Sequence, residues 1–494
     1  MSAPGISHIQ RFPGLVALSL LLACCAPRPP DVAAPAGAPI VALPPTWTPT
    51  SSPTMVHATN ALPSDTPTPS PTRARTTAVL STLVPTSSLR DTAGMLAVPM
   101  RINPEDETSD IFLLDTAGGP LVNLTAHSTW GEHYRPVWSP DGTRLAFVSL
   151  PSLEDWRDTT IEIVNADGTG LVDLSLTIPR RLDWSSLRLN SAVWSRDGSL
   201  LAFTANEEDE DRSFLFVSSA DGTEARLVAS DIDRWVDPAW SSDGKVLYYV
   251  PDSEGTSALH SVSVEDGASS EVMELGPVYG LELSPDGRLV AWLASSPDGG
   301  SVVLGITDPS TQSTSRVDLP FPMPGTLANP PQYDILGWSP TGDRLALEAV
   351  YQLPISRFSP WEFSYLFVVD AQGVQTGAIM EIAIDRGLAW SGVAWSPSGR
   401  EITYSEAYAC SLLDRETCSE VYRLQVDRGS PWRLTNVGGA TSGAHWSPDG
   451  RRLAFASSGT VNLDSLYVMS ADGTQLVKLL EGWSIGYPVW SPLQ

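Results

Sequence analysis

The chain has 494 residues, 42% of them hydrophobic and 17 of them Trp, so it holds enough apolar material for one large core or for many small cores in series. That composition excludes disorder throughout. Beyond residue 95, 25 basic side chains stand against 54 acidic ones. This balance argues against nucleic acid as a partner, because nucleic-acid affinity depends on basic contacts with phosphates.

The beginning of the chain predicts a processing segment. His8 and Arg11 precede the apolar run GLVALSLLLACC, which is too short to span a bilayer and has the length of a signal-peptide apolar region. The end of this run, residues 21–24 (LLAC), resembles the lipobox of bacterial lipoproteins. By that resemblance, residues 1–23 are a lipoprotein signal peptide. Cys24 then becomes a lipidated N-terminus at the outer face of the bacterial cell membrane or envelope. An ordinary secretory signal with an incidental Cys24 is the alternative.

Residues 24–93 predict a linker without a packed core. Positions 27–90 hold 14 Pro, 12 Thr and 7 Ser, in runs such as PPTWTPTSSPT. A segment of this composition stays extended and partly polyproline-like, with a length of at most ~200 Å at about 3.1 Å per residue. We expect a stalk that holds the following domain away from a membrane, and an unstructured tail without a role is the alternative.

One sequence unit recurs through the rest of the chain, as in RPVWSPDGTRLAFVS, SAVWSRDGSLLAFTA and GAHWSPDGRRLAFAS. Its landmark residue is Trp in seven copies and Leu in one, spaced about 43 to 57 residues apart: Trp138, Trp194, Trp240, Leu283, Trp338, Trp395, Trp446 and Trp490. A period near 50 residues indicates a repeat architecture.

The Ser-Pro-Asp-Gly segment after each landmark predicts a tight turn between two strands, since Pro presets φ and Gly accepts a positive φ. Gly occurs in all seven full copies, at Gly142, Gly198, Gly244, Gly287, Gly342, Gly399 and Gly450. The Asp is replaced by Thr341 and Ser398 in two copies, which favours a role in the turn over calcium binding.

Two further strands follow each hairpin, as in IEIVNADGTG and LVDLS, and four antiparallel strands make a propeller blade. The segments MLAVPMRI, IFLLDTAGG and LVNLT lack a first strand, and YPVWS near the C-terminus supplies one. Residues 94–494 therefore predict an all-β, eight-bladed β-propeller that is closed by a blade shared between the two ends.

The WSPDGxxLAF and xADGT units are similar to the WD-like repeats of the TolB family and of the propeller domains that precede prolyl-oligopeptidase catalytic domains. The resemblance covers about residues 95–494 and implies the propeller fold. TolB-type proteins have six blades and a separate α/β domain in front, whereas eight units follow a lipobox and a Pro/Thr-rich segment here. Residues 482–486 (GWSIG) fit the Gly-x-Ser-x-Gly nucleophile pattern. We do not expect Ser484 to be catalytic, because no helix, His, Asp or Glu follows it.

The segments that lead into the first strands carry aromatic and polar side chains, which would gather around the central channel on one face. The candidate ligand-binding residues are His133, Tyr134, Arg135, Trp184, Trp235, Asp237, Tyr279, Tyr333, Asp334, Trp390 and Tyr487. Packing of these loops against one another is the alternative. Cys410 and Cys418 predict a small disulfide in an exported protein. The scattered His residues predict no metal site, and we expect no cofactor.

We therefore expect a non-catalytic binding or interaction module, a monomeric propeller whose ligand is a protein, peptide or glycan and whose membrane contact is a lipid anchor. One alternative is a hydrolase or lyase with its site at the channel mouth, and another is a structural subunit of an envelope assembly. Converging carboxylates with perturbed pKa values would favour the enzyme. A large apolar patch on the rim would favour the assembly subunit.

Overall fold

The computed structural model describes residues 94–102, 108–126, 131–150, 159–178, 187–207, 212–233, 236–252, 257–276, 278–296, 301–319, 332–353, 361–371, 379–382, 392–409, 417–428, 431–458 and 463–492. All of them belong to one unit of the chain, Thr82–Gln494. The predicted signal peptide, Cys24 and the predicted linker lie outside the described residues. In these ranges there is no helix that is long and apolar enough to span a membrane.

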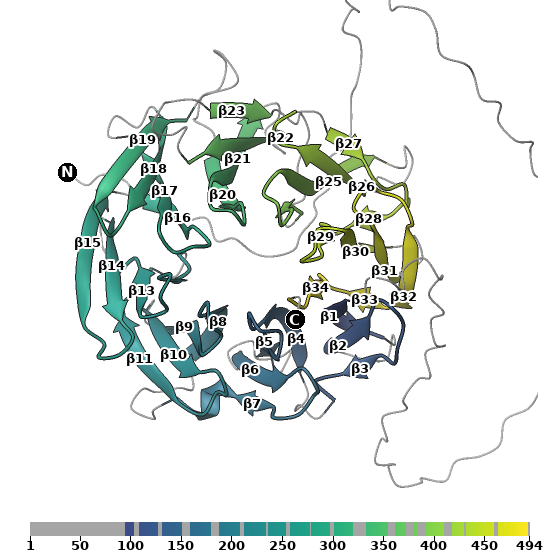
Figure 1. Ribbon diagram of the computed structural model, residues 1–494, viewed down its shortest axis with the longest axis horizontal. Helices are drawn as coiled ribbons and strands as arrows, with labels where there is room; N and C mark the ends of the chain where they lie inside the picture. Colours follow the sequence, from purple (N-terminus) through teal and green to yellow (C-terminus); the bar gives the residue numbers. More distant parts are fainter. Residues whose placement is uncertain are drawn as a thin grey trace, which may run out of the picture. The chain divides into compact units, whose positions relative to one another are not determined.

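Eight antiparallel sheets surround a central channel, and this arrangement confirms the predicted eight-bladed propeller (Figure 1). We number the sheets as blades 1 to 8, in the order in which their outermost strands follow one another along the chain. Blade 1 holds β1 (Met95–Arg101), β2 (Asp110–Asp115), β3 (Val122–Asn123), β33 (Ser484–Ile485) and β34 (Val489–Trp490). Blade 2 holds β4 (Glu132–Trp138), β5 (Arg144–Leu150), β6 (Thr160–Asn165) and β7 (Val172–Asp173), followed by the short 3-10 helix η3 (Leu174–Leu176).

The next three blades each contain four strands that follow one another along the chain. Blade 3 holds β8 (Leu187–Trp194), β9 (Leu200–Glu207), β10 (Arg212–Ser219) and β11 (Ala225–Ser230). Blade 4 holds β12 (Ala239–Trp240), β13 (Val246–Tyr249), β14 (Ser257–Ser263) and β15 (Ser269–Gly276). Blade 5 holds β16 (Val278–Leu283), β17 (Val290–Ser295), β18 (Val302–Asp308) and β19 (Ser313–Asp318).

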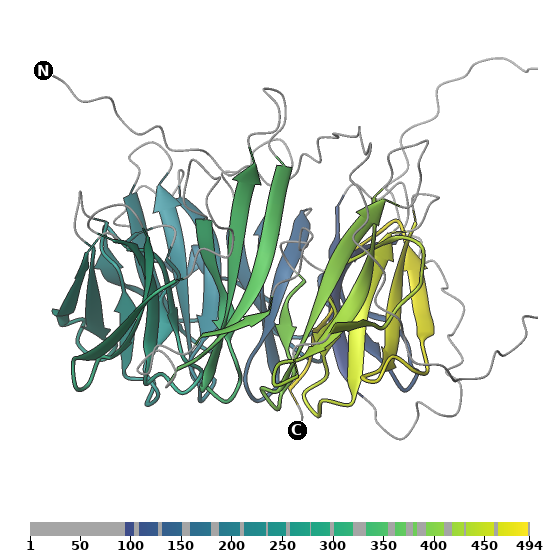
Figure 2. The same cartoon turned by 90° about the horizontal axis from the view of Figure 1, so that it is seen from above.

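The last three blades lead back to blade 1. Blade 6 holds β20 (Gln332–Trp338), β21 (Arg344–Leu353), β22 (Trp361–Asp370) and β23 (Ile379–Ile382). Blade 7 holds β24 (Ala394–Trp395), β25 (Glu401–Ala409), β26 (Thr417–Gln425) and β27 (Pro431–Arg433). Blade 8 holds β28 (Ala440–Thr441), β29 (His445–Trp446), β30 (Arg452–Ser458), β31 (Asp464–Ser470) and β32 (Val477–Gly482). Figure 2 shows the ring edge-on, with the strands running between its two faces.

The Ser-Pro-Asp-Gly turns all join the first two strands of their blades, and we call the face that carries them the turn face. In blade 2, Ser139 Oγ donates to Asp141 Oδ1 at 2.6 Å, and the backbone N–H of Thr143 donates to the same oxygen at 3.0 Å. These bonds hold the pKa of the Asp141 carboxyl below its usual value, while Gly142 takes a φ of 67°. The Asp carboxylate thus stabilises the turn. Its replacement by Thr341 and Ser398 in two blades agrees with a role in the turn and not in calcium binding.

The landmark Trp residues join neighbouring blades. Each indole N–H donates, at 2.9 to 3.2 Å, to the backbone oxygen of the residue just before the landmark in the preceding blade. We call these seven bonds the indole belt. The donors and acceptors are Trp138 to Val489, Trp194 to Val137, Trp240 to Val193, Trp338 to Glu282, Trp395 to Gly337, Trp446 to Ala394 and Trp490 to His445. The repeated Trp is therefore a connector between blades.

Each of the eight junctions between blades has its own apolar core. Between blades 5 and 6, for example, Leu293 and Leu304 pack with Leu347 and Phe367, all of them 0 to 1% exposed. Second and third strands are apolar on both faces because each sheet is covered by a neighbour on either side. The fold is thus eight small cores in series, as the composition allows.

The two ends of the described chain meet in blade 1, as predicted. Leu96 pairs with Trp490 and Met100 pairs with Ile485. The inner strand is interrupted between β33 and β34, where it faces Pro99, which has no N–H to donate. Next to this blade, the buried Arg452 of blade 8 donates from Nη1 to Thr116 Oγ1 of blade 1 at 2.9 Å.

Candidate functional site

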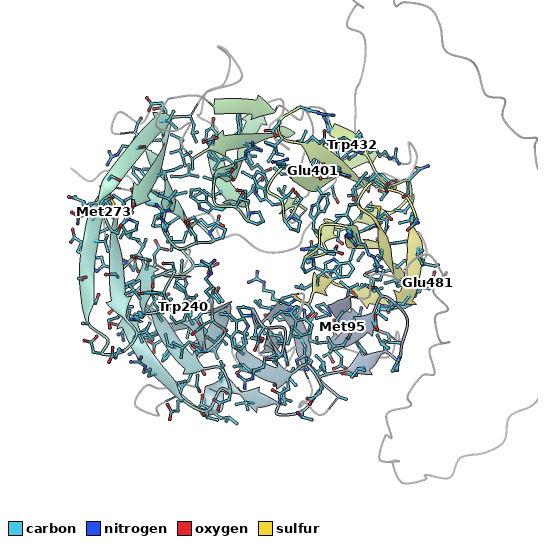
Figure 3. The ribbon with its side chains drawn as sticks, in the orientation of Figure 1. Met95, Trp240, Met273, Glu401, Trp432 and Glu481 are labelled. Carbon is cyan, nitrogen blue, oxygen red and sulfur yellow. The ribbon has the colours of Figure 1, made fainter. Side chains whose placement is uncertain are left out.

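The channel wall is built from the innermost strands of the blades, as Figure 3 shows around Trp240, whereas Met273 and Glu481 lie on the outer rim. In β4, Arg135 and Val137 are exposed, while Pro136 and Trp138 are buried. The same alternation occurs before Trp240 and Trp490. The exposed members belong to the innermost segments of their blades, which border the channel (Figure 1).

We call the residue just before each landmark the wall position. Six wall positions carry small or aliphatic residues: Val137, Val193, Ala239, Gly337, Ala394 and Val489. The other two are Glu282 in blade 5 and His445 in blade 8, and all eight are exposed or half-buried. The titratable chemistry of this ring of residues therefore lies at two points.

Glu282 is held between two neighbouring blades. Burial, with a smaller contribution from the charge of Asp237 at the start of blade 4's inner segment, raises the pKa of its carboxyl to about 7, against a backbone hydrogen bond from Trp338 that lowers it. The carboxyl lies beside blade 6, since a Cβ built on Gly337 would lie 3.6 Å from Glu282 Oε1. Glu282 can thus accept or donate a proton near neutral pH.

His445 and Tyr487 form an aromatic pair across the junction between blades 8 and 1. Their ring centroids are 6.2 Å apart, with the rings inclined at 61°. Tyr487 is 44% exposed, and burial lowers the pKa of His445, so its imidazole is neutral at pH 7. A neutral imidazole beside an exposed phenol can hydrogen-bond and stack on a ligand without carrying charge.

The charged and aromatic residues at and just before the wall positions form two arcs. The aromatic arc consists of His445, Tyr487 and the exposed Arg135, in the consecutive blades 8, 1 and 2. The carboxylate arc consists of Asp237 and Glu282, in blades 4 and 5 on the other side of the ring (Figure 1). The wall can therefore present a cationic and aromatic surface opposite an acidic one.

The structure separates the predicted ligand-binding residues into three groups. Arg135, Asp237 and Tyr487 are exposed, and Tyr134 and Asp334 are half-buried. His133 and Tyr333 are each 1% exposed, in strands β4 and β20, where their rings pack on Phe147 and Phe367. Trp184, Trp235, Trp390 and the side chain of Tyr279 lie outside the described residues.

The expectation that His133 and Tyr333 lie in loops is therefore wrong. The inner strands β4 and β20 begin six residues before their landmarks, so both residues belong to a strand, and their rings pack in the apolar core. Sequence reasoning also overlooked Glu282 and His445 as wall residues. Aligning the residue before each landmark would have found them, because ELS and HWS stand out among VWS, AWS and GWS.

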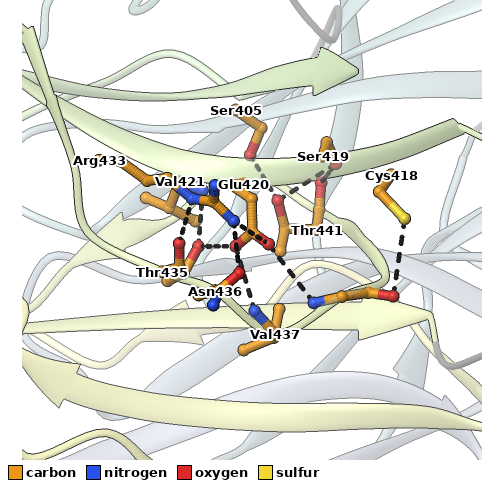
Figure 4. Close-up of polar contacts among 11 residues, drawn as sticks. Ser405, Cys418, Ser419, Glu420, Val421, Arg433, Thr435, Asn436, Val437 and Thr441 are labelled. Carbon is orange, nitrogen blue, oxygen red and sulfur yellow. Dashed lines mark hydrogen bonds and ion pairs between the residues drawn. The ribbon is translucent and has the colours of Figure 1, made fainter. Parts of the chain in front are cut away.

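A second polar cluster lies on the outer part of blade 7 (Figure 4). Glu420 is fully buried and accepts hydrogen bonds from Thr435 Oγ1 and the backbone N–H of Val437, and Arg433 Nη2 lies 2.8 Å from its Oε1. Burial alone would raise the pKa of Glu420, but these partners hold it below its usual value. These contacts fix the segment between β27 and β28, which indicates a structural role for the cluster.

The cysteine prediction concerns the same blade. Cys418 is buried on β26, is disulfide-bonded, and has its Sγ 3.6 Å from the backbone oxygen of Gly438. Cys410 lies outside the described residues, so its pairing with Cys418 stays a prediction. Across the described ranges, no three His, Cys, Asp or Glu side chains are grouped so that they could hold a metal ion.

Comparisons with known proteins agree with this geometry. Residues 183–334 match the family model described as the lipoprotein LpqB β-propeller domain. The Tol-Pal system protein TolB of Francisella tularensis (strain WY96-3418) is 22% identical over 284 residues, which are 56% of this chain and 59% of that protein. The domain is a TolB-like propeller.

Other relatives of the TolB-like propeller match over shorter segments. An uncharacterized protein of Agrobacterium fabrum (strain C58) is 31% identical over 103 residues, which are 21% of this chain and 31% of that protein. An uncharacterized peptidase of Bacillus subtilis (strain 168) is 30% identical over 100 residues, which are 20% of this chain and 15% of that protein. The chain spans less than two thirds of the length of these curated relatives.

Solved structures resemble the TolB-like propeller more distantly. A structure from an analysis of two prolyl endopeptidases has a TM-score of 0.48 and 15% identity, covering 72% of this chain and 50% of that chain. TolB from Acinetobacter baumannii has a TM-score of 0.32 and 16% identity, covering 74% of this chain and 82% of that chain.

Proposed function

We propose that the chain is an exported, lipid-anchored envelope protein whose TolB-like propeller binds a protein, peptide or glycan without catalysing a reaction on it. The match of residues 183–334 to a lipoprotein propeller family and the lipobox-like residues 21–24 support the anchor. The division of the channel wall into an aromatic arc and a carboxylate arc supports the binding role.

The two arcs favour a ligand that carries both a cationic group and either an anionic or an aromatic one. Arg135 and Tyr487 are exposed on one side, and Asp237 is exposed on the other. An exposed ring next to charged groups is the composition of binding surfaces for peptides and sugars, where aromatic and Arg side chains supply most of the affinity. This chemistry defines the class of ligand that we propose.

Screening the full chain on arrays of envelope-protein peptides and bacterial glycans tests the binding role. For the ligand that binds, Arg135→Ala and Tyr487→Ala should each weaken the affinity by roughly tenfold or more, which corresponds to 1 to 3 kcal/mol for an anchor residue. Trp432→Ala is the matched control, because Trp432 is 36% exposed but lies on the outer strand of blade 7. Equal losses in all three variants would contradict binding at the channel wall.

The anchor has a separate test. Cys24→Ala should release the protein from the membrane fraction after a high-salt wash, whereas Cys25→Ala should leave it there, because lipidation requires the thiol at the lipobox position. Retention of the Cys24→Ala variant in the membrane fraction would exclude anchoring through this residue.

One observation favours a second candidate, a hydrolase or lyase. Glu282 has a pKa raised to about 7, and Asp237 is the carboxyl that contributes to this rise. Two carboxyl groups with separated pKa values can divide the roles of acid and base. The test is hydrolysis of fluorogenic glycosides or peptides at pH 6 to 8. Activity in the wild type that disappears in both Glu282→Gln and Asp237→Asn would establish the catalytic role in place of the binding role. Equal rates in the wild type and both variants would exclude it.

A further inference from the structure

One junction of the ring lacks its member of the indole belt. The landmark of blade 5 is Leu283, whose side chain has no N–H to donate to the backbone oxygen of Ala239 in blade 4. The corresponding bond is present at the other seven junctions, each between an indole and a backbone oxygen. A hydrogen bond of this kind contributes modestly to the association of the groups that it joins.

The apolar core at this junction resembles the others. Its buried members, within the described residues, are Leu259, Leu275, Leu283, Val290, Trp292 and Ala294. The junction between blades 7 and 8 has a buried core of the same size. The junction between blades 4 and 5 therefore differs from the others in its missing belt bond and not in its packing.

Blades 4 and 5 approach most closely at the turn face. A Cβ built on Gly287 would lie 2.5 Å from the backbone N of Ser242 and 2.9 Å from the backbone oxygen of Trp240. At the other six turn glycines, a built Cβ meets no backbone atom of the preceding blade within 3 Å. Because sheets are stiff, contact at one end of a junction makes that end the pivot for any separation at the other.

Like charges lie on the two sides of the same junction. Asp237 precedes β12 of blade 4, Glu282 is the residue before the last one of β16 in blade 5, and the charge of Asp237 acts on Glu282. Ionised carboxylates on both sides repel, and no belt bond counters them at this place. The closing junctions beside blade 1 keep the belt bonds of Trp490 and Trp138, and Arg452 adds a further bond. Between blades 4 and 5, a side-chain bond runs instead from Gln312 Nε2, just before β19, to the backbone oxygen of Val272 in β15 at 2.8 Å.

We infer that the propeller opens at the junction between blades 4 and 5, pivoting at the Gly287 turn and separating at the face opposite the turns. The closing blade, where the two ends of the chain meet, stays shut. Opening widens the channel beside Glu282 and gives a ligand a lateral path to the wall. The inference concerns the ring itself and stands whether or not the wall binds a peptide or glycan.

Thiol labelling of buried cysteines in the full chain tests the inference. Ala294→Cys places a thiol in the junction between blades 4 and 5. Ala349→Cys is the position-matched control in the junction between blades 5 and 6. Ala294 pairs with Val278 and Ala349 pairs with Tyr333. Val278 and Tyr333 both lie five residues before the landmark of their blade. Ala456→Cys is the exposure-matched control in the junction between blades 8 and 1, with 4% exposure against 5% for Ala294. Peptide mass spectrometry separates these thiols from the native cysteines.

We expect the thiol of Ala294→Cys to react with iodoacetamide at least tenfold faster than either control, and Leu283→Trp to slow it to the rate of the controls. Equal rates at the three positions would overturn the inference, and so would an unchanged rate after Leu283→Trp. If the Leu283→Trp protein does not fold, Trp338→Leu in the Ala349→Cys background gives the reciprocal test. Removing that belt bond should speed labelling at Ala349→Cys at least tenfold, and no change would count against an opening controlled by the belt.

Discussion

Glu282 should make the stability of the propeller fall as pH rises from about 4.5 to about 7. Its pKa is raised from 4.5 to about 7 in the folded chain, chiefly by burial. Below pH 4.5 the carboxyl is protonated in both the folded and the unfolded state. As pH rises from there, the unfolded chain loses the proton first, so the stability conferred by the proton on the folded chain is lost progressively up to about pH 7. At about 1.4 kcal/mol per unit of pKa, the full loss is roughly 3 kcal/mol.

Urea unfolding followed by Trp fluorescence between pH 4.5 and 8.5 measures this loss. The wild type should lose roughly 3 kcal/mol more of its free energy of unfolding than Glu282→Gln across that interval. His445 opposes the trend below pH 6.5, since its lowered pKa destabilises the folded state as pH falls, but it is present in both proteins and cancels in their difference. Glu265→Gln, at an exposed turn, should follow the wild type. Parallel curves for the wild type and Glu282→Gln would refute the reasoning.

Two further predictions concern the blades themselves. Gly305→Ala should lower the free energy of unfolding by about 1 to 3 kcal/mol, because its Cβ would lie 2.0 Å from Cε2 of the buried Trp292. Gly119→Ala is the control, since its Cβ would meet its nearest atom at 3.7 Å. It should change the free energy of unfolding by less than about 0.5 kcal/mol in the same urea titration. Similar losses for both would rule out the steric explanation. Glu420→Ala should lower the melting temperature by several degrees, since about 3 kcal/mol is lost when a buried, hydrogen-bonded ion pair is broken. Lys478→Ala, which breaks an exposed pair with Glu481, should leave it nearly unchanged, and a drop as large as that of Glu420→Ala would contradict the assigned importance of burial.

Sequence reasoning reached the fold because the signals that define it are local. The turn after each landmark depends on four neighbouring residues, and a period near 50 residues depends only on the repetition of that turn. The number of blades follows from counting strands, and the shared blade follows from the first-strand pattern YPVWS, which completes the strand patterns that begin at Met95. The role of the repeated Trp as a bond between blades was not predicted, since the acceptor of Trp138, the backbone oxygen of Val489, lies 351 residues away.

The channel wall depended on tertiary structure. Whether an aromatic residue near a landmark reaches the channel or the core is decided by strand length and bulges, which is why Tyr333 is buried while Tyr487 is exposed. The raised pKa of Glu282 arises from burial between two blades and from the charge of Asp237 in the preceding blade, and it is opposed by a backbone hydrogen bond from Trp338 in the following blade. Local sequence determined which residues form each blade. The distances between blades, which no short segment contains, decided what those residues face and how strongly they hold their protons.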